Sequence, residues 1–183
     1  TISSAGLIGG GSYPRPGEVS LAHHGILFLD ELPEFRRDII ELLRQPLEDR
    51  KVTIARALVS LTYPADFMLI ASMNPCPCGF YSDTVKKCSC TGPQINNYLK
   101  RISGPLLDRF DIHIEVPRIN TGQILSSLSQ DGSNLMRKSV VNARQIQYKR
   151  FSSTSLFNNA AMTGQDVYIH CTINKDIRKI LKQ

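Results

Sequence analysis

The sequence predicts an α/β fold built on a parallel sheet with flanking helices. Three short apolar segments, at 26–30, 67–74 and 110–117, each end in a polar side chain or directly follow one. Apolar runs of this length are typical of strands that are buried on both faces, as in a parallel sheet. Between the first two segments, apolar residues recur at helical spacing, which predicts a helix beside the sheet.

The first half of the chain gives four elements in order. Gly and Pro dominate residues 5–19, which predicts a loop before the first strand at 26–30. Pro33 suits the first turn of the helix expected from 34 to 48. Its apolar stripe consists of Ile39, Ile40, Leu42, Leu43 and Leu47. Partly alternating β-branched residues over 51–63 predict a hairpin with a basic tip.

Further along, 67–74 is the second strand, 104–109 a helical turn and 110–117 the third strand. Ser, Gln, Gly and Asn then dominate residues 121–133, which predicts a linker between a core at 1–120 and a helical segment at 134–183. An Asn is expected to cap the last helix, in NKDIRKILKQ.

The distribution of charged residues also changes at the end of this predicted linker. Up to Gly132 the chain has 13 Lys and Arg against 14 Asp and Glu, whereas from Ser133 onward it has 9 against 2. A separate basic end is typical of a protein with a polyanionic partner, although a solvated helix face has the same composition.

The hydropathy of the sequence predicts no membrane-spanning helix. The 183 residues suffice for one domain with a small appendage. No apolar run approaches the roughly 20 residues that span a bilayer. The N-terminus lacks a signal-peptide pattern, so we expect a cytoplasmic protein with no membrane partner.

Polar residues at the strand ends are the candidate site. Asp30 and Glu31 close the first strand, Asn74 closes the second, and Arg109 immediately precedes the third. Ligands of parallel sheets gather at the carboxyl ends of strands. Two acids there suit holding a divalent metal and polarising a water beside a nucleotide.

These residues lie in stretches that resemble the magnesium-chelatase-like family of AAA+ ATPases, and specifically its ComM-type branch. The stretches are GGGSYPRPGEVSLAHHGILFLDELPEF, LLRQPLEDRKVTIARA, SMNPCPCGF and RISGPLLDRFDIHIEVP. The resemblance is close over residues 2–118, and the chain from 134 is similar to the start of the family's helical lid. It implies a partial AAA+ sheet, a four-cysteine insert and a truncated α-helical lid.

The resemblance also implies a role for each polar residue. Asp30 would hold Mg²⁺ and Glu31 would activate the attacking water, as the Walker B pair. Asn74 would be the sensor that orients this water against the γ-phosphate of ATP. Arg109 would be the arginine finger, which acts on ATP in the neighbouring subunit of a ring.

Two of these expectations have plainer alternatives. Arg109 would otherwise form a salt bridge with Asp108 or Asp111. The predicted hairpin is similar to the family's pre-sensor hairpin, which points into the central pore in hexameric relatives. Lys51 and Arg56 would then contact a DNA backbone, whereas a surface hairpin without a partner is the alternative.

The phosphate-binding half of an ATP site is not in this sequence. The pattern G-x-x-x-x-G-K-[ST] is absent, because no Gly-Lys dipeptide occurs. In the family this loop and its strand precede the part that resembles this chain. The chain is therefore expected to be the middle of a longer protein, to lack the central strand of the sheet, and by itself to bind ATP poorly and hydrolyse it negligibly.

Four of the five cysteines form two C-x-C pairs, Cys76 with Cys78 and Cys88 with Cys90. In a reducing cytoplasm such pairs are more often metal ligands than disulfides, and four thiolates fit tetrahedral Zn²⁺. Free thiols and disulfides are the alternatives, because C-x-C is a less common ligand spacing than C-x-x-C. Cys171 stands apart and is expected in the core.

The function implied by the resemblance is that of the central part of an ATP-dependent motor. Its cofactors would be ATP and Mg²⁺, and it would form a ring, expected to be a hexamer, that acts on DNA as a helicase in branch migration during recombination or transformation. One alternative is the ATPase subunit of a magnesium chelatase. The other is a non-hydrolytic, zinc-stabilised module that binds nucleic acid.

Overall fold

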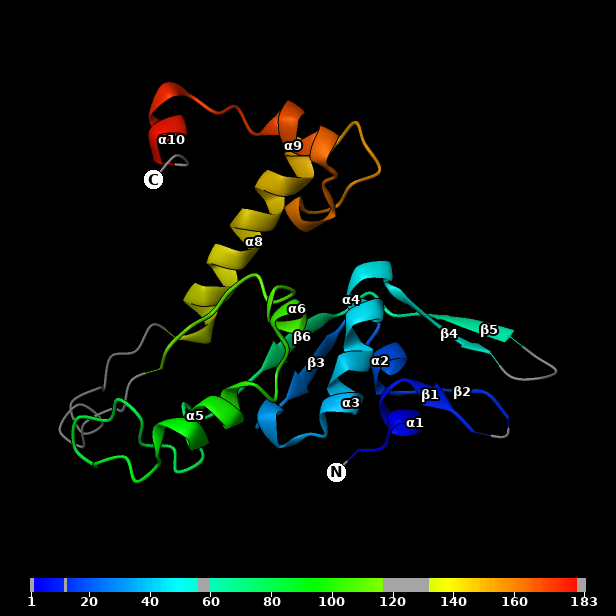
Figure 1. Ribbon diagram of the computed structural model, residues 1–183. Helices are drawn as coiled ribbons and strands as arrows, with labels where there is room; N and C mark the ends of the chain where they lie inside the picture. The colour runs from blue at the N-terminus through cyan, green and yellow to red at the C-terminus, as the bar shows by residue number, and fades with distance from the viewer. Residues whose placement is uncertain (1, 12, 56–59, 117–131, 181–183) are drawn as a thin grey trace. The chain divides into compact units, whose positions relative to one another are not determined.

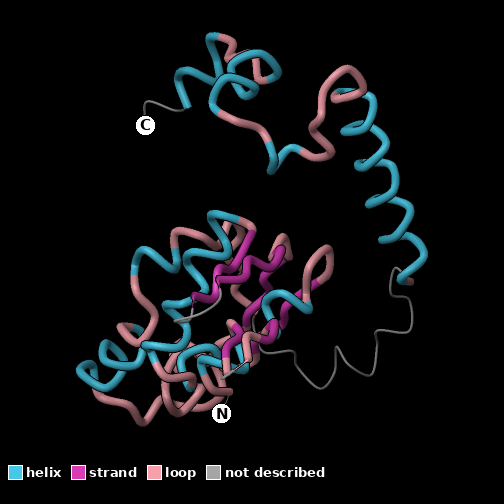
Figure 2. The backbone as a smooth tube through the Cα atoms, turned by 90° about the vertical axis from the view of Figure 1, so that its right-hand side faces the viewer, coloured by secondary structure: helices cyan, strands magenta, loops and turns pink. Residues whose placement is uncertain are grey.

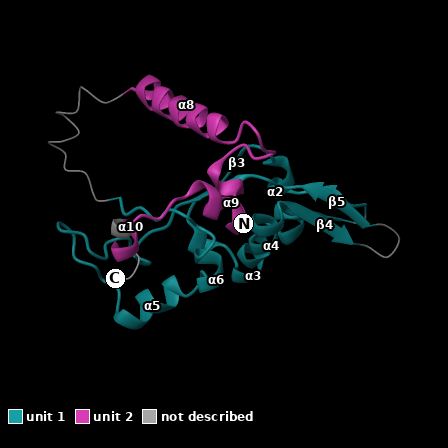
Figure 3. Ribbon diagram, turned by 90° about the horizontal axis from the view of Figure 1, so that it is seen from above, with its two compact units in different colours: residues 1–118 teal, residues 119–183 magenta. Residues whose placement is uncertain are grey.

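The computed structural model describes residues 2–11, 13–55, 60–116 and 132–180. They form two compact units, Thr1–Arg118 and Ile119–Gln183, which we call unit 1 and unit 2 (Figure 3). The linker expected at 121–133 lies almost wholly outside the described residues, and its last residue, Ser133, already belongs to a helix.

A two-stranded parallel sheet lies at the centre of unit 1 (Figure 1). Strand β3 (Ile26–Leu29) pairs with β6 (Met68–Ala71), from Ile26 opposite Met68 to Leu29 opposite Ala71. The first two predicted strands are therefore neighbours in a parallel sheet, as expected. Their carboxyl ends lie at the same edge of this sheet.

The helix expected over 34–48 is present but divided. It comprises η1 (Leu32–Glu34), α3 (Arg37–Ile40), η2 (Glu41–Leu43) and α4 (Arg44–Asp49). Pro33 lies in the first turn of η1, as predicted. Pro46 has no N–H to donate to the carbonyl of Leu42, and the chain tightens into the 3₁₀ turn η2 just before it.

The core of unit 1 fills the space between the sheet and these helices. Leu27 and Leu29 of β3 belong to the same buried cluster as Ile40 and Leu43, which are both 0% exposed. Deleting a fully buried side chain of this size leaves a cavity and lowers stability. The α3–α4 segment is thus held to the sheet by apolar packing.

The other face of the sheet is open. Ile26 and Phe28 of β3 are 60% and 57% exposed, and Met68 and Ile70 of β6 are 56% and 41% exposed. The expectation that these strands are buried on both faces is therefore wrong, because no described segment covers this face. Parallel sheets ordinarily have both faces covered.

Because of this open face, we expect the 183-residue chain to self-associate and to bind an apolar fluorescent dye. Replacing Phe28 and Met68 by serine should reduce both effects, since it removes apolar area from the patch. Sedimentation velocity and dye fluorescence measure them. Leu21→Ser, at a residue 69% exposed outside the sheet, is the control. A monomeric wild-type chain that binds no dye would contradict this expectation.

The third predicted strand, at 110–117, is not formed over its described residues, and Pro117 lies outside them. Residues 110–116 have no regular secondary structure, and Ile112, Ile114 and Val116 are 75%, 78% and 82% exposed. A strand requires hydrogen bonds to a neighbouring strand, and none of the described strands pairs with this segment. The alternating side chains favour a strand, but the pairing edge that would complete it is not among the described residues.

The expected hairpin is present. Strands β4 (Lys51–Ala55) and β5 (Ser60–Pro64) pair antiparallel and project from the rest of unit 1 (Figures 1 and 3). Val52 and Ile54 are buried at its base, and the Tyr63 hydroxyl donates to the Pro14 carbonyl at 3.0 Å. Arg56 and the rest of the tip lie outside the described residues.

The segment expected to be a loop at 5–19 contains short regular pieces. These are α1 (Ser4–Leu7), β1 (Gly9–Gly10), β2 (Arg15–Pro16) and α2 (Glu18–Leu21), with β1 and β2 antiparallel. Gly9 has φ +110°, and a Cβ there would lie 2.5 Å from the Arg15 carbonyl oxygen. Only glycine allows this close pairing.

The remaining helices complete both units (Figure 2). Unit 1 adds α5 (Gly92–Leu99) and α6 (Gly104–Leu107); unit 2 contains α8 (Ser133–Arg150), η3 (Asn159–Ala161), α9 (Gly164–His170) and α10 (Lys175–Ile180). As predicted, Asn174 caps α10, where its side chain accepts from the Ile177 N–H at 2.9 Å. No helix in the described part of the chain has the length and apolarity needed to cross a membrane.

Candidate functional site

The ends of β3 and β6 are tied together by hydrogen bonds. Asp30 Oδ1 accepts from the Ser72 hydroxyl and from the Glu31 N–H, the latter at 3.0 Å. The Ser72 N–H donates to the Leu29 carbonyl at 3.0 Å, and its carbonyl accepts from the Leu32 N–H at 2.9 Å. The Asp30 carboxylate is thus fixed at the carboxyl edge of the sheet.

Asp30 and Glu31 are both exposed, so their carboxylates are accessible to a ligand. Both hydrogen bonds to Asp30 use Oδ1, which leaves Oδ2 as a cation ligand. Mg²⁺ is commonly held by one or two carboxylates together with phosphate oxygens and waters. The residues present at this edge therefore fit the metal, although the pattern that cradles phosphates is absent from the sequence.

Glu31 has a left-handed backbone, with φ 52° and ψ 49°. This conformation costs a non-glycine residue on the order of 1–3 kcal/mol and is found disproportionately at functional sites. The Glu31 N–H donates to Asp30 and lies 3.3 Å from the Ser72 hydroxyl oxygen. These contacts hold the turn that presents the second carboxylate.

Asn74 lies in the loop that follows β6 and is exposed. Tyr98, a buried residue of α5, is a neighbour of this loop. Burial raises the pKa of the Tyr98 phenol, and a hydrogen bond to the Asn74 backbone opposes this shift. Tyr98 also experiences the negative charges of Glu34 and Glu31. Tyr98 therefore lies beside the loop that carries Asn74.

Arg109 follows α6 and forms an ion pair with Glu48 of α4. The two side chains are 40% and 45% exposed, and an ion pair this exposed contributes at most about 1 kcal/mol. Among the described ion pairs its partner is Glu48, not Asp108 or Asp111. A guanidinium held this weakly remains available to another anion.

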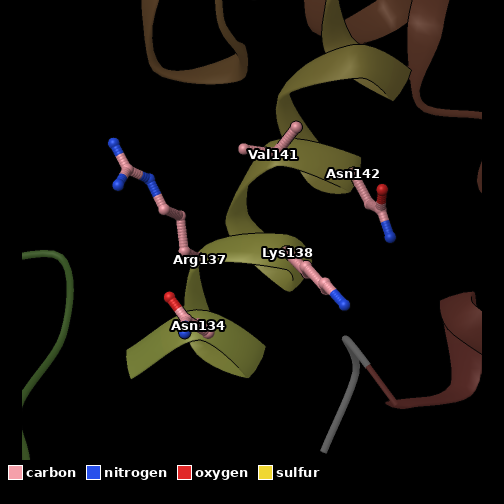
Figure 4. Close-up of a pocket in the computed structure, with 5 residues that line it drawn as sticks. All are labelled: Asn134, Arg137, Lys138, Val141 and Asn142. Atoms are coloured by element: carbon pink, nitrogen blue, oxygen red, sulfur yellow. The ribbon is translucent and has the colours of Figure 1, made fainter. Parts of the chain in front are cut away.

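Basic residues gather on α8, which has no acidic residue. All of α8 is exposed except Gln147, which is half-buried. The basic residues are Arg137, Lys138, Arg144, Lys149 and Arg150. A hollow of about 400 Å³ on this helix is lined by Asn134, Arg137, Lys138, Val141 and Asn142 (Figure 4). Its lining offers cationic and amide N–H donors without a carboxylate. Lys51, the other described basic candidate, is exposed at the start of β4.

The four cysteines converge. Their sulfur atoms all lie within 4.8 Å of one another. Cys76 Sγ is 3.3 Å from Cys78 Sγ and 3.7 Å from Cys88 Sγ, and the last two are 3.5 Å apart. The C-x-C spacing therefore does bring both sulfurs of a pair to one point, and the cluster could hold a metal ion. All four are free thiols.

The thiols differ in acidity. Backbone N–H groups of Phe80 and Ser89 lower the pKa of Cys78 to about 5. Burial raises the pKa of Cys90 to about 12. A backbone hydrogen bond from Cys90 lowers the pKa of Cys88, but burial and the neighbouring Cys78 and Cys76 outweigh it, so the pKa of Cys88 is raised. Thiolates this close repel one another, so a cation is needed before all four can ionise together.

Sequence analysis missed three contributors to the site. Ser72 fixes Asp30, Tyr98 contacts the Asn74 loop, and Glu48 pairs with Arg109. A hydroxyl two residues before Asn74, at the end of a strand, was a usable signal for Ser72. The other two depend on packing between helices and loops that no local pattern shows. Cys171, expected in the core, is exposed.

Comparisons with known proteins agree on one family. Residues 1–124 match the family described as magnesium chelatase, subunit ChlI. The chain is 43% identical over 178 residues to YifB of Salmonella typhimurium, and 43% identical over 176 residues to the competence protein ComM of Haemophilus influenzae. These alignments cover 96% and 95% of this chain but 34% and 33% of the relatives.

The chain is also 34% identical, over a shorter stretch of 61 residues, to the magnesium-chelatase 38 kDa subunit of Acidiphilium rubrum. This match covers 33% of this chain and 18% of that subunit. The chain thus spans about a third of the length of YifB and ComM. The chain belongs to the magnesium-chelatase-like AAA+ family and is of the ComM type.

Proposed function

We propose that this chain is the central part of an ATP-dependent motor that acts on DNA. The observation that carries the proposal is the parallel pairing of β3 with β6, which brings Asp30, Glu31 and the Asn74 loop to one edge of the sheet. An edge of this kind is where α/β proteins bind nucleotides. The family membership supports the same reading.

In this proposal each residue of the edge has one task. Asp30 holds Mg²⁺ through Oδ2, and Ser72 keeps that carboxylate in place. Glu31 takes a proton from the attacking water, and Asn74 orients the water. The residues that hold the phosphates belong to another segment of the full-length protein, which is in keeping with the share of YifB and ComM that this chain covers.

We propose a ring, with a hexamer as the expected form, in which Arg109 reaches the ATP of the neighbouring subunit. Rings are typical of this family. A guanidinium suits the task, because it stays charged and can donate two hydrogen bonds to phosphate oxygens. The weak, exposed pair with Glu48 would open when the neighbouring subunit presents its nucleotide.

DNA is the proposed substrate, and helicase activity in branch migration is the proposed work. Two groups of basic residues support this: those of the exposed helix α8, and Lys51, which is exposed on the hairpin. Arg56, which lies outside the described residues, follows Lys51 in the same hairpin sequence and is proposed to act with it. Lys and Arg side chains bind DNA chiefly through its phosphates, so binding with little sequence preference is expected. The proposed cofactors are ATP and Mg²⁺ at the sheet edge and Zn²⁺ at the four cysteines. The cytoplasm is the compartment that provides ATP and DNA together.

Replacing Arg137 and Arg144 by glutamine should weaken DNA binding by the full-length protein at every sequence. Each lost phosphate contact should reduce the slope of log affinity against log salt by about 0.7–0.9. Fluorescence anisotropy over a salt series measures both effects. The control is Lys87→Gln with Lys100→Gln, which removes the same charge from unit 1. Equal losses in the two double variants would contradict a specific role for α8.

The test of the proposed function is ATP hydrolysis by the full-length protein with and without DNA. We expect Mg²⁺-dependent hydrolysis that DNA stimulates. The match to the Acidiphilium rubrum subunit favours a second candidate, a magnesium-chelatase ATPase. That candidate predicts stimulation by chelatase partner subunits and indifference to DNA. Salt-sensitive DNA binding without any hydrolysis would instead favour a non-hydrolytic binding module.

A further inference from the structure

We propose that the four cysteines bind one Zn²⁺ and that this ion anchors helix α5, which in turn positions the Asn74 loop relative to the Glu31 turn. The metal site is inferred from the cysteines alone. Its positioning role rests on the proposed ATP site. The two parts are separable by experiment.

The arrangement of the sulfurs fits a single tetrahedral ion. With Zn–S bonds of about 2.3 Å, neighbouring sulfurs of a tetrahedral site lie about 3.8 Å apart. The observed separations of 3.3, 3.7 and 3.5 Å are close to this value. Disulfide-bonded sulfurs would be about 2.05 Å apart, so the cluster is not arranged as two disulfides.

The donor set selects zinc. Four sulfurs in a tetrahedron are typical of Zn²⁺ or iron. A closed site with four protein ligands and no open position is typical of structural zinc. The burial pattern agrees: Cys76 is 0% exposed and the other three cysteines are half-buried, so the cluster is largely closed by the chain itself.

Apart from the cysteines, little in the loop that carries them would hold it in one conformation. Residues 72–91 contain no helix or strand, and Cys76 is the one buried residue among them. Tyr81 and Val85 are 50% and 68% exposed, so no apolar core orders this loop. Loops of this length without regular structure are uncommon in compact domains, and a metal can substitute for the absent core.

The cluster leads directly into α5. Cys90 is followed by Thr91, which starts α5 with a capping box: the Thr91 N–H donates to Gln94 at 2.8 Å. An ion bound at Cys90 would therefore fix the first turn of this helix. Because Cys76 lies two residues after Asn74, the same ion would fix the far end of the Asn74 loop.

The other end of α5 contacts both halves of the candidate site. Tyr98 is 4% exposed, and the neighbouring Asn74 backbone lowers the pKa of its phenol against the raising effect of burial. Just beyond the helix, Arg101 donates to the Pro33 carbonyl at 3.0 Å and pairs with Glu34 at 3.3 Å, in the turn that follows Glu31. Helix α5 thus bridges the Asn74 loop and the segment after Glu31, and a metal at its start limits how the bridge can move. Tyr98 is a positioning residue in this arrangement.

The experiment uses the full-length protein with Cys88→Ser and Cys90→Ser together, and Cys171→Ser as the matched control. Metal content by mass spectrometry should give one zinc per chain in wild type and in the control, and none in the double variant. Replacement by Co²⁺ should give the absorption of a four-thiolate tetrahedral site. Iron in place of zinc, or no retained metal, would overturn the metal assignment.

The positioning role has its own readouts. Hydrogen exchange over 73–100 should become faster in the double variant and in wild type stripped by a chelator, and should recover when Zn²⁺ is restored. kcat for ATP should fall on the order of tenfold to a hundredfold, with KM changed less, because a small misplacement near the reacting atoms has effects of this size. Tyr98→Phe should lower kcat in the same direction while it retains zinc.

Unchanged exchange and unchanged kcat after zinc removal would overturn the positioning role even if zinc binds. If wild type hydrolyses no ATP, the proposed function fails. The zinc content and the hydrogen exchange would still decide the inference in that case. If the double variant does not fold, the removal of zinc from wild type by a chelator and its return still test the inference.

Discussion

Replacing Glu31 by glutamine in the full-length protein is expected to lower the rate of ATP hydrolysis by about a thousandfold, within the range typical for loss of a general base. Glutamine has the size and shape of glutamate but cannot accept a proton from water. The Glu31 turn is fixed by backbone bonds to Asp30 and Ser72, which this substitution leaves in place. ATP affinity should therefore stay within about threefold of wild type.

Rates of phosphate release and the binding of a fluorescent ATP analogue measure these two quantities. Glu18→Gln is the matched control, because Glu18 is exposed in α2, away from the sheet edge. It should hydrolyse ATP at the wild-type rate. If Glu31→Gln is as fast as the control, Glu31 is not the general base, and its left-handed backbone has another cause.

Arg109→Ala is expected to lower ATP turnover by about a thousandfold, the lower end of what an arginine finger contributes. The alternative is that Arg109 only stabilises the fold through Glu48. Glu48→Gln separates the two, because it breaks the same ion pair and keeps the arginine. Loss of an exposed pair should reduce the free energy of unfolding by at most about 1 kcal/mol in either variant.

If Arg109 acts on ATP bound to the neighbouring subunit, two variants that are inactive alone should complement each other when mixed. A mixture of Arg109→Ala and Glu31→Gln subunits contains interfaces in which an intact Arg109 meets an intact Glu31. Such a mixture should hydrolyse ATP faster than either variant alone. No gain on mixing, or equal losses in Arg109→Ala and Glu48→Gln, would contradict the proposed role.

Much of the fold was predictable from the sequence because local patterns determine it. The apolar runs before Asp30 and Asn74 do form neighbouring parallel strands, β3 and β6. The β-branched alternation of 51–63 does form a hairpin, and the Asn cap before α10 is present. Each of these signals lies within a few residues along the chain.

The predictions that were wrong concern contacts between segments that are distant in the sequence. Residues 110–116 have the pattern of a strand but no described strand pairs with them, and Ile26 and Phe28 are apolar yet open to solvent. An apolar pattern shows that a surface must be covered, but not what covers it. The pairing of Arg109 with Glu48 was not predicted either. Helix α4 and the segment after α6 are far apart in the sequence and come into contact only in the folded protein.

The candidate site was predictable as residues but not as a connected unit. Asp30, Glu31 and Asn74 follow strands whose order along the chain was clear, so a shared edge was expected. The contact of Ser72 with Asp30 and the position of Tyr98 depend on how the loop after β6 packs against the Glu31 turn and against helix α5. The convergence of two C-x-C pairs is likewise a property of the folded loop.

The Mg²⁺ dependence of ATP hydrolysis by Asp30→Asn full-length protein tests the sheet edge most directly. Asparagine keeps the Oδ1 that accepts from Ser72 and Glu31, but it removes the negative charge that a hard cation prefers. If Asp30 holds the metal, the Mg²⁺ concentration for half-maximal turnover should rise by about tenfold or more, and the maximal rate should fall. An unchanged Mg²⁺ requirement at an unchanged rate would contradict a magnesium–ATP site at the ends of β3 and β6.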